Sequence, residues 1–271
     1  MKPLYYLLAI SLLLLSGCSL WPEQKDKTAG WSEQKLYTEA TDSMRGGNYA
    51  TAIEYYQKLE SRYPFGRYAM QSQLNIAYAY YRQEEPDPAM AAIERFIKLH
   101  PDHPAVAYAL YLKGLVSFNQ NMGFFARFLP TDNSQRDPGS TTESYNHFAE
   151  LIRRFPDSEY AADARLRMFY LRNNLARHEL HVARYYMDRG AFLAAANRAQ
   201  YVVENYQYTP AVRDALGIMV ISYERMGMEE LYRDALRVLA LNEQKGNFVT
   251  TEDEEQSLTE RIWEYLELDK N

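Results

Sequence analysis

The sequence of 271 residues contains a single cysteine, Cys18, so it cannot form an intramolecular disulfide. The residues next to Cys18 include no histidine or acidic side chain of the kind that activates a catalytic thiol. No basic tract is present either, and 30 Lys and Arg residues stand against 36 Asp and Glu, so a nucleic-acid partner is not expected. Glycine-rich phosphate loops, nucleophile elbows and paired-carboxylate motifs are also missing. We therefore expect neither an enzyme nor a cofactor-binding protein.

The apolar run near the N-terminus is too short to span a membrane. It extends from Leu4 to Leu15, whereas a spanning helix needs about 20 apolar residues. A positive charge at Lys2 precedes the run, and two small residues follow it directly before Cys18. This layout is typical of a secretory signal peptide with its cleavage site. We predict a signal peptide at residues 1–17.

The sequence Leu-Ser-Gly-Cys that ends at Cys18 resembles a bacterial lipobox. In signals of that family the cysteine thiol receives a diacylglycerol, and the freed amine receives a further acyl chain. More than one acyl chain is what stable anchoring requires. The residue after the cysteine is Ser19, and lipoproteins with serine there usually sort to the outer membrane. The resemblance implies a chain lipidated at Cys18, anchored in the outer membrane and facing the periplasm, with residues 18–31 as its linker.

A repeat of 37 residues runs through the rest of the chain. Small residues recur at that interval at Ala40, Ala77 and Gly114, and again at Ala183 and Val220. A second pattern accompanies the first, with the spacing i, i+4, i+7, i+11, which is one face of an α-helix. These stripes are Ala52/Tyr56/Leu59/Tyr63, Ala89/Ile93/Phe96/His100, Ser144/Phe148/Leu151/Phe155 and Ala195/Ala199/Val202/Tyr206, with Tyr232/Leu236/Leu239 as an incomplete fifth. Proline directly follows three of the stripes and ends the helix there. Each unit is therefore predicted to be two helices joined by a turn.

This pattern resembles the tetratricopeptide repeat, whose usual length is 34 residues. Runs of alternating apolar and polar residues, which an all-β fold needs, are lacking. We predict an all-α chain in which residues 32–242 form a right-handed solenoid of about five degenerate repeats. Residues 243–271 form a tail. Within the tail, Thr251 with Glu254 fits a capping box and Leu258, Ile262 and Leu266 share one face, so an extra helix is expected that caps the solenoid or meets a partner.

The repeat is interrupted between Gly114 and Ala183 by 32 extra residues, since their separation is 69 rather than 37. Residues 121–140 are predicted to be an inserted loop, and residues 157–190 a single long helix. The loop contains Phe124, Phe125 and Phe128, which either contact a partner or pack back onto the solenoid.

Two further features have alternative interpretations. His178 and His181 are spaced i, i+3, which is not the spacing of the zinc motif H-E-x-x-H, and no third ligand is evident, so no metal site is predicted. The 24 tyrosines either pack between helices or line a surface that binds an extended chain.

Beyond the repeat, the chain resembles the BamD family, the lipoprotein subunits of the β-barrel assembly machinery of Gram-negative outer membranes. The resemblance lies in "RYPFGRYAMQSQLNIAYAYY", "IERFIKLHPDHP", "YLKGL", "SQRDP" and "VARYYMDRGAFLAAANR", and it covers Lys35 to about Leu241 together with the lipobox. It implies a non-catalytic scaffold. Its partners would be the periplasmic domains of the BamA-like barrel-forming subunit, unfolded outer-membrane proteins and accessory lipoproteins. The alternatives are a periplasmic repeat adaptor for cell-wall or protease regulation, and an enzyme with an unrecognised site.

Besides the phenylalanines of the loop, three residues are predicted to contact partners. Phe65 and Tyr68 cluster with basic residues in "RYPFGRY" and are candidates for binding extended peptides, whereas Tyr63 and Pro64 in the same turn are expected to be structural. Arg198, in "AAANRAQ", neighbours the fourth stripe, so its head group is expected at the surface beside the core. The resemblance implies that it faces the last soluble domain of the barrel-forming subunit.

Overall fold

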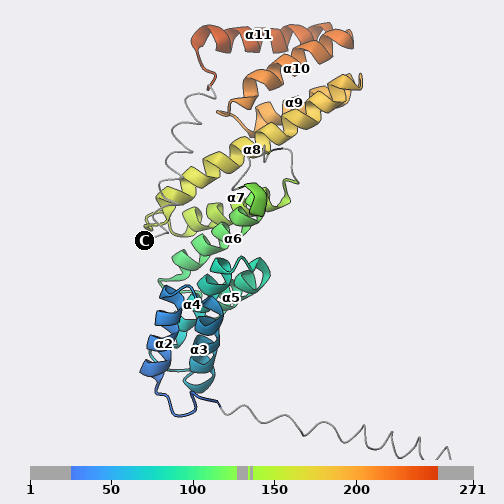
Figure 1. The fold of residues 1–271 in the computed structure, drawn as a ribbon. Coiled ribbons are helices and arrows are strands. Elements are labelled where there is room, and N and C mark those ends of the chain that lie inside the picture. Colours follow the sequence, from blue (N-terminus) through green and yellow to red (C-terminus); the bar gives the residue numbers. More distant parts are fainter. Residues whose placement is uncertain (1–25, 127–133, 135–136, 250–271) are drawn as a thin grey trace, which may run out of the picture.

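Ten α-helices make up the part of the chain that the computed structural model describes, residues 26–126, 134 and 137–249, and no strand occurs within it. Consecutive helices pair and stack into an elongated rod, with α2 and α3 at one end and α11 at the other (Figure 1). A short turn joins the two helices of every pair except α6 and α7. The five pairs confirm an all-α repeat solenoid. They are α2 (Glu33–Arg45) with α3 (Tyr49–Arg62), α4 (Ala69–Arg82) with α5 (Pro86–Leu99), α6 (Val106–Ala126) with α7 (Gly139–Arg154), α8 (Ala161–Asp188) with α9 (Phe192–Asn205), and α10 (Ala211–Arg225) with α11 (Glu229–Lys245).

The helical stripes predicted from the sequence form the core. The first three members of each of the four complete stripes are fully buried: Ala52, Tyr56, Leu59, Ala89, Ile93, Phe96, Ser144, Phe148, Leu151, Ala195, Ala199 and Val202. The fourth members occupy the C-cap positions of α3, α5, α7 and α9, so the aromatic or histidine residue ends each helix as expected. The incomplete fifth stripe differs, because Leu236 on the terminal helix α11 is 41% exposed.

The small residue in the third unit is required by close helix packing. A Cβ atom added to Gly114 on α6 would lie 2.4 Å from Cε1 of Phe148 on α7, well inside van der Waals contact. Ser144 of α7 also donates a hydrogen bond from Oγ to the Gly114 carbonyl, over 3.0 Å. Glycine therefore leaves room on α6 for the Phe148 ring and allows the Ser144 side chain of α7 to reach the α6 backbone.

The turns inside the units use the left-handed backbone region. Gly47, Gly190 and Gly227 have φ of 75°, 69° and 69°, and Glu84 takes the same place in the second unit at 60°. Only glycine adopts this region without steric cost. The glycines that mark the turns in the sequence are therefore there for backbone conformation.

The same substitution at two glycines should have opposite effects on stability. Gly190→Ala should lower the free energy of unfolding by about 1 kcal/mol, because φ is +69° and alanine is strained there. Gly217→Ala, inside helix α10, should raise it by about 0.5–1 kcal/mol, because alanine has the higher helix propensity. An added Cβ meets nothing within 4 Å at either position, so packing does not distinguish them. Urea denaturation of the two variants measures both values, and equal signs would contradict the backbone explanation.

Of the two elements predicted between Gly114 and Ala183, the long helix is present and the loop is shorter than predicted. The long helix is confirmed as α8, which has 28 residues and packs against α7, α9 and α10. The predicted loop at residues 121–140 is wrong at its start, because α6 continues through Ala126 and includes Phe124 and Phe125. Proline is absent until Pro130, and Gly123 alone costs only about 1 kcal/mol in a helix, which is too little to end it.

Candidate partner-binding surfaces

Arg198 lies on the surface of the fourth unit, where the sequence places it. It projects from α9 with its side chain 48% exposed, and its Nη1 is 3.0 Å from Oε2 of Glu179 on α8. Glu179 itself is only 15% exposed, so one edge of the guanidinium is held by a largely buried carboxylate. Because guanidinium carries five N–H donors, the half-exposed remainder is oriented and available to an acidic partner.

Aromatic side chains adjoin this ion pair. The rings of Tyr201 and Tyr206 lie 5.9 Å apart and nearly perpendicular. Burial, followed by the proximity of Tyr201 and Glu179, raises the pKa of Tyr206 to about 12, so its phenol stays neutral. Tyr201 is 44% exposed. An arginine beside an exposed tyrosine is the composition that protein interfaces favour.

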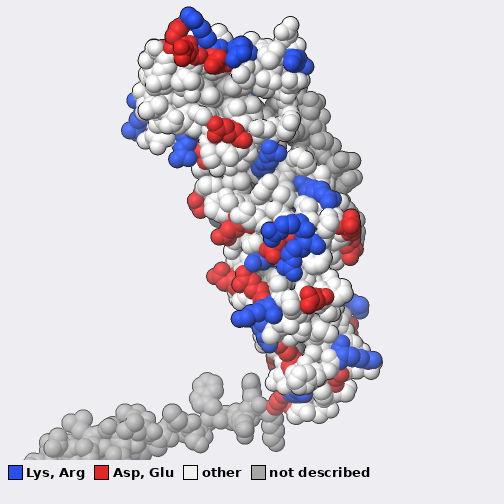
Figure 2. Space-filling view, turned by 180° about the vertical axis from the view of Figure 1, so that it is seen from behind, with Lys and Arg blue, Asp and Glu red and all other residues white. Residues whose placement is uncertain are grey.

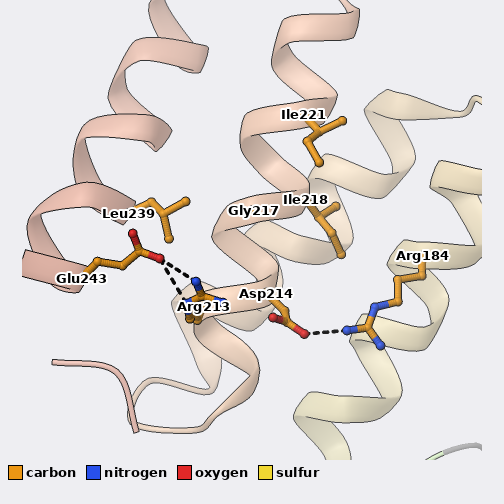
Figure 3. Close-up of a pocket in the computed structure, with 8 residues that line it drawn as sticks. All are labelled: Arg184, Arg213, Asp214, Gly217, Ile218, Ile221, Leu239 and Glu243. Atoms are coloured by element: carbon orange, nitrogen blue, oxygen red, sulfur yellow. Dashed lines mark hydrogen bonds and ion pairs between the residues drawn. The ribbon is translucent and has the colours of Figure 1, made fainter. Parts of the chain in front are cut away.

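A groove between α8, α10 and α11 was not predicted from the sequence. Its volume is about 330 Å³, and Gly217, Ile218, Ile221 and Leu239 form its apolar part (Figure 3). Two ion pairs frame it: Arg184–Asp214 at 2.5 Å and Arg213–Glu243 at 2.8 Å. The combination of an apolar floor and a charged rim suits an amphipathic segment of another protein. The residues come from three helices, so no local motif reveals the groove; the glycine inside helix α10 is its only local signal.

The structure separates the two candidates in the first inter-unit turn. Phe65 is fully exposed. Tyr68 instead stacks on Tyr37, with ring centroids 4.3 Å apart, and its backbone N–H donates to Glu33 Oε1 over 2.9 Å. The guanidinium of Arg67 covers the ring at 4.4 Å. Tyr68 thus has a packing role, and only Phe65 presents its whole ring to the surroundings.

Many tyrosines connect neighbouring units through their phenol groups. Tyr56 Oη bonds with Thr41 of α2 and accepts from Asn75 of α4, and burial raises its pKa. Tyr81 on α4 accepts from Asn119 of α6 over 2.9 Å. These residues pack between helices, which is the first of the two interpretations of the tyrosine content.

His178 and His181 both contact Ser134, which lies between α6 and α7 in the chain. The Nδ1 of His178 donates to the Ser134 carbonyl over 2.9 Å, and Nε2 of His181 is 3.0 Å from Ser134 Oγ. Ser134 is 2% exposed. Sequence spacing alone did not reveal this role, because Ser134 is more than forty positions away.

Several predicted features lie outside the described residues. These are Cys18, Phe128 and the tail helix, while the side chains of Phe124 and Phe125 are likewise not described. Among residues 26–126, 134 and 137–249, no group of His, Cys, Asp and Glu is placed to hold a metal ion. No helix of that part is long and apolar enough to cross a bilayer. Acidic and basic side chains are mixed along the rod on the face seen in Figure 2.

Comparison with known proteins extends over most of the chain. The YfiO family model, described as an outer membrane lipoprotein, matches residues 30–239. An outer membrane protein assembly factor BamD from Neisseria meningitidis is 49% identical, covering 90% of this chain and 93% of that protein. The BamD of Vibrio cholerae is 38% identical, with 87% and 96% covered, and that of Haemophilus influenzae is 33% identical, with 88% and 90% covered. The similarity therefore begins before α2 and continues into α11.

Proposed function

Because the chain belongs to the BamD family of outer-membrane lipoproteins, we propose that it is a non-catalytic scaffold that assists the assembly of β-barrel proteins into the outer membrane. The observation that supports this most strongly is the extent of the similarity. At 49% identity it covers 90% of the chain, whereas a shared helical repeat alone would match only the small and aromatic packing positions. In this function the chain is anchored through lipids on Cys18 and faces the periplasm.

The C-terminal units bind the periplasmic domains of the BamA-like barrel-forming subunit. The surface around Arg198 supports this part of the proposal, because its guanidinium is fixed by Glu179 and remains half exposed. The groove lined by Gly217 and Ile221 lies in the next unit and offers an apolar contact. The N-terminal half receives unfolded outer-membrane proteins, for which Tyr68 and Phe65 stay predicted contacts. Accessory lipoproteins are further partners. Phe124, Phe125 and Phe128 stay candidates for contact with a partner of either kind.

Affinity purification of the full chain from solubilised membranes tests the proposed function. We expect a barrel-forming outer-membrane subunit to co-purify in stoichiometric amount. Depletion of the chain should reduce the amount of folded β-barrel protein in the outer membrane. Recovery of cell-wall enzymes or proteases in place of the barrel subunit would favour a periplasmic adaptor instead.

Arg198→Glu should weaken binding to the barrel-forming subunit by more than about tenfold, because losing one partner of a desolvated interfacial charge pair costs about 2–5 kcal/mol. Helicity and melting temperature should stay close to those of the unchanged chain, since Arg198 is half exposed and solvent screens its pair with Glu179, so the pair contributes only about 0–1 kcal/mol. Binding is measured directly with the purified periplasmic domains.

Arg95→Glu provides a matched control. Arg95 on α5 is 59% exposed and pairs with Glu60, which is 15% exposed, so the local arrangement resembles Arg198 with Glu179. The control lies in the second unit and should leave affinity unchanged. Equal affinities for both variants would mean that Arg198 is an ordinary surface arginine.

A further inference from the structure

The residues that lead into the first helix are held tightly on the first unit. Asp26 accepts a hydrogen bond from Lys58 Nζ over 3.0 Å and also pairs with Arg62. Arg62 further donates to the carbonyl and Oγ1 of Thr28, which is 2% exposed. Hydrogen bonds from the backbone and side chain of Thr28 hold the pKa of Asp26 well below its usual range, so the carboxylate stays charged at neutral pH. Asp26 is therefore a fixed point of the N-terminal segment, held against α3.

The next residues extend this attachment. The ring of Trp31 packs at 5.4 Å from Tyr55, and its carbonyl accepts from Tyr63 Oη over 3.0 Å. Lys35 Nζ lies 4.5 Å from the Trp31 ring centroid. The N-terminal segment is therefore attached to the first unit from Asp26 onward, and not only from the start of α2.

The fixed point limits how far the first unit can lie from the membrane. Cys18 and Asp26 are eight residues apart, and eight residues fully extended reach at most about 26–29 Å. With lipids on Cys18, as the proposed function requires, the end of the solenoid that holds Asp26 stays within that distance of the bilayer surface. The opposite end, at α11, is not restrained in this way (Figure 1).

The turn between α3 and α4 lies at the same end as the fixed point. Tyr63 bonds to Trp31, and Tyr68 bonds to Glu33, so both ends of the turn are attached to the N-terminal segment. Gly66 lies directly against Glu33: an added Cβ would be 2.2 Å from Oε1. Phe65, between these contacts, is fully exposed.

We infer that the turn Tyr63–Tyr68 faces the bilayer and that Phe65 enters the membrane interface. This inference rests on the lipid anchor of the proposed function. An aromatic ring in water gains free energy on entering the interface between head groups and acyl chains. Two exposed cations at this end favour anionic phospholipid head groups: Arg67 lies two residues from Phe65 in the chain, and Lys27 directly follows the fixed Asp26. The short tether keeps the ring close to the bilayer, so even a weak contact is populated.

A thiol-reactive probe tests this contact in the full lipidated chain. Cys18 is the only cysteine of the sequence, and in the proposed function its thiol is acylated, so Phe65→Cys supplies a single reactive site for an environment-sensitive fluorophore. The protein is reconstituted into vesicles of phosphatidylethanolamine and phosphatidylglycerol that carry a lipid-borne quencher. Leu236→Cys on α11 is the control, since Leu236 is also exposed but lies at the other end of the rod. We expect quenching at position 65 to exceed that at position 236 by at least about threefold.

The outcomes separate this inference from the function on which it rests. Equal quenching at both positions, in protein that floats with the vesicles, overturns the membrane contact and leaves the anchor intact. A probe at position 65 that responds only to an added C-terminal peptide of a barrel protein also overturns it, and leaves Phe65 with the substrate contact of the proposed function alone. Protein that fails to float refutes the anchor itself, and the membrane contact with it.

Discussion

Asp163→Ala should lower the free energy of unfolding by about 3–5 kcal/mol, because it leaves a buried arginine charge without its partner. The carboxylate and Arg167 are 4% and 3% exposed, and Arg167 Nε donates to Asp163 Oδ2 over 2.6 Å. Tyr111 of α6 donates to the same oxygen over 2.7 Å, and the guanidinium lies 5.0 Å from the Phe118 ring centroid. Burial alone would lower the pKa of Arg167, but the carboxylate beside it keeps that pKa raised, so the arginine stays charged.

The expected loss is a large part of the about 5–15 kcal/mol that stabilises a typical domain. The lost interaction lies where α8 meets α6 and α7. The units before α8 and those after it should therefore be less strongly coupled, and unfolding should become less cooperative. Urea denaturation followed by circular dichroism measures both effects.

A double variant distinguishes the stranded charge from a simple loss of contacts. Asp163 Oδ1 and Arg167 Nη1 have no hydrogen-bond partner among the described residues, so the pair is incompletely satisfied. Asp163→Leu combined with Arg167→Met should therefore be neutral or more stable than the unchanged chain by about 1–4 kcal/mol. A double variant as unstable as Asp163→Ala would show that the pair itself, and not the uncompensated charge, provides the stability.

The core of this protein is predictable from the sequence because burial follows helical periodicity. Tyr56 and Ile93, the second members of successive stripes, lie 37 residues apart along the chain yet occupy equivalent buried faces, since each repeat buries the same stripe. Turn residues are predictable for a similar local reason: Gly190 is needed for its own φ. The ends of helices are less predictable from the sequence: α6 extends past Gly123, because one glycine does not end a helix.

Partner surfaces are harder to predict, because exposure and pairing depend on residues from other helices. Phe65 and Tyr68 stand in one motif, but contacts with α2 leave only Phe65 fully exposed. Arg198 could be placed at the core edge from its neighbours in α9, whereas its pairing with Glu179 requires the fold. Asp163 with Arg167 has the i, i+4 spacing of an ordinary surface pair, and only the stacking of units shows that it is buried.

Cys18→Ser should release the folded protein from the membrane fraction, with attachment falling by about tenfold or more, since stable anchoring takes more than one acyl chain. Residues 26–249 should keep their fold, because Cys18 lies outside the described solenoid and its core. The contact inferred for Phe65 does not compensate, because a single exposed ring binds membranes only weakly without the tether. Partner proteins could retain the variant, so fractionation is done after a high-salt wash in cells that lack the barrel-forming subunit. Circular dichroism of the released protein should show the same helicity as the lipidated chain. A folded variant that still sediments with the outer membrane under these conditions would disprove lipid anchoring through Cys18.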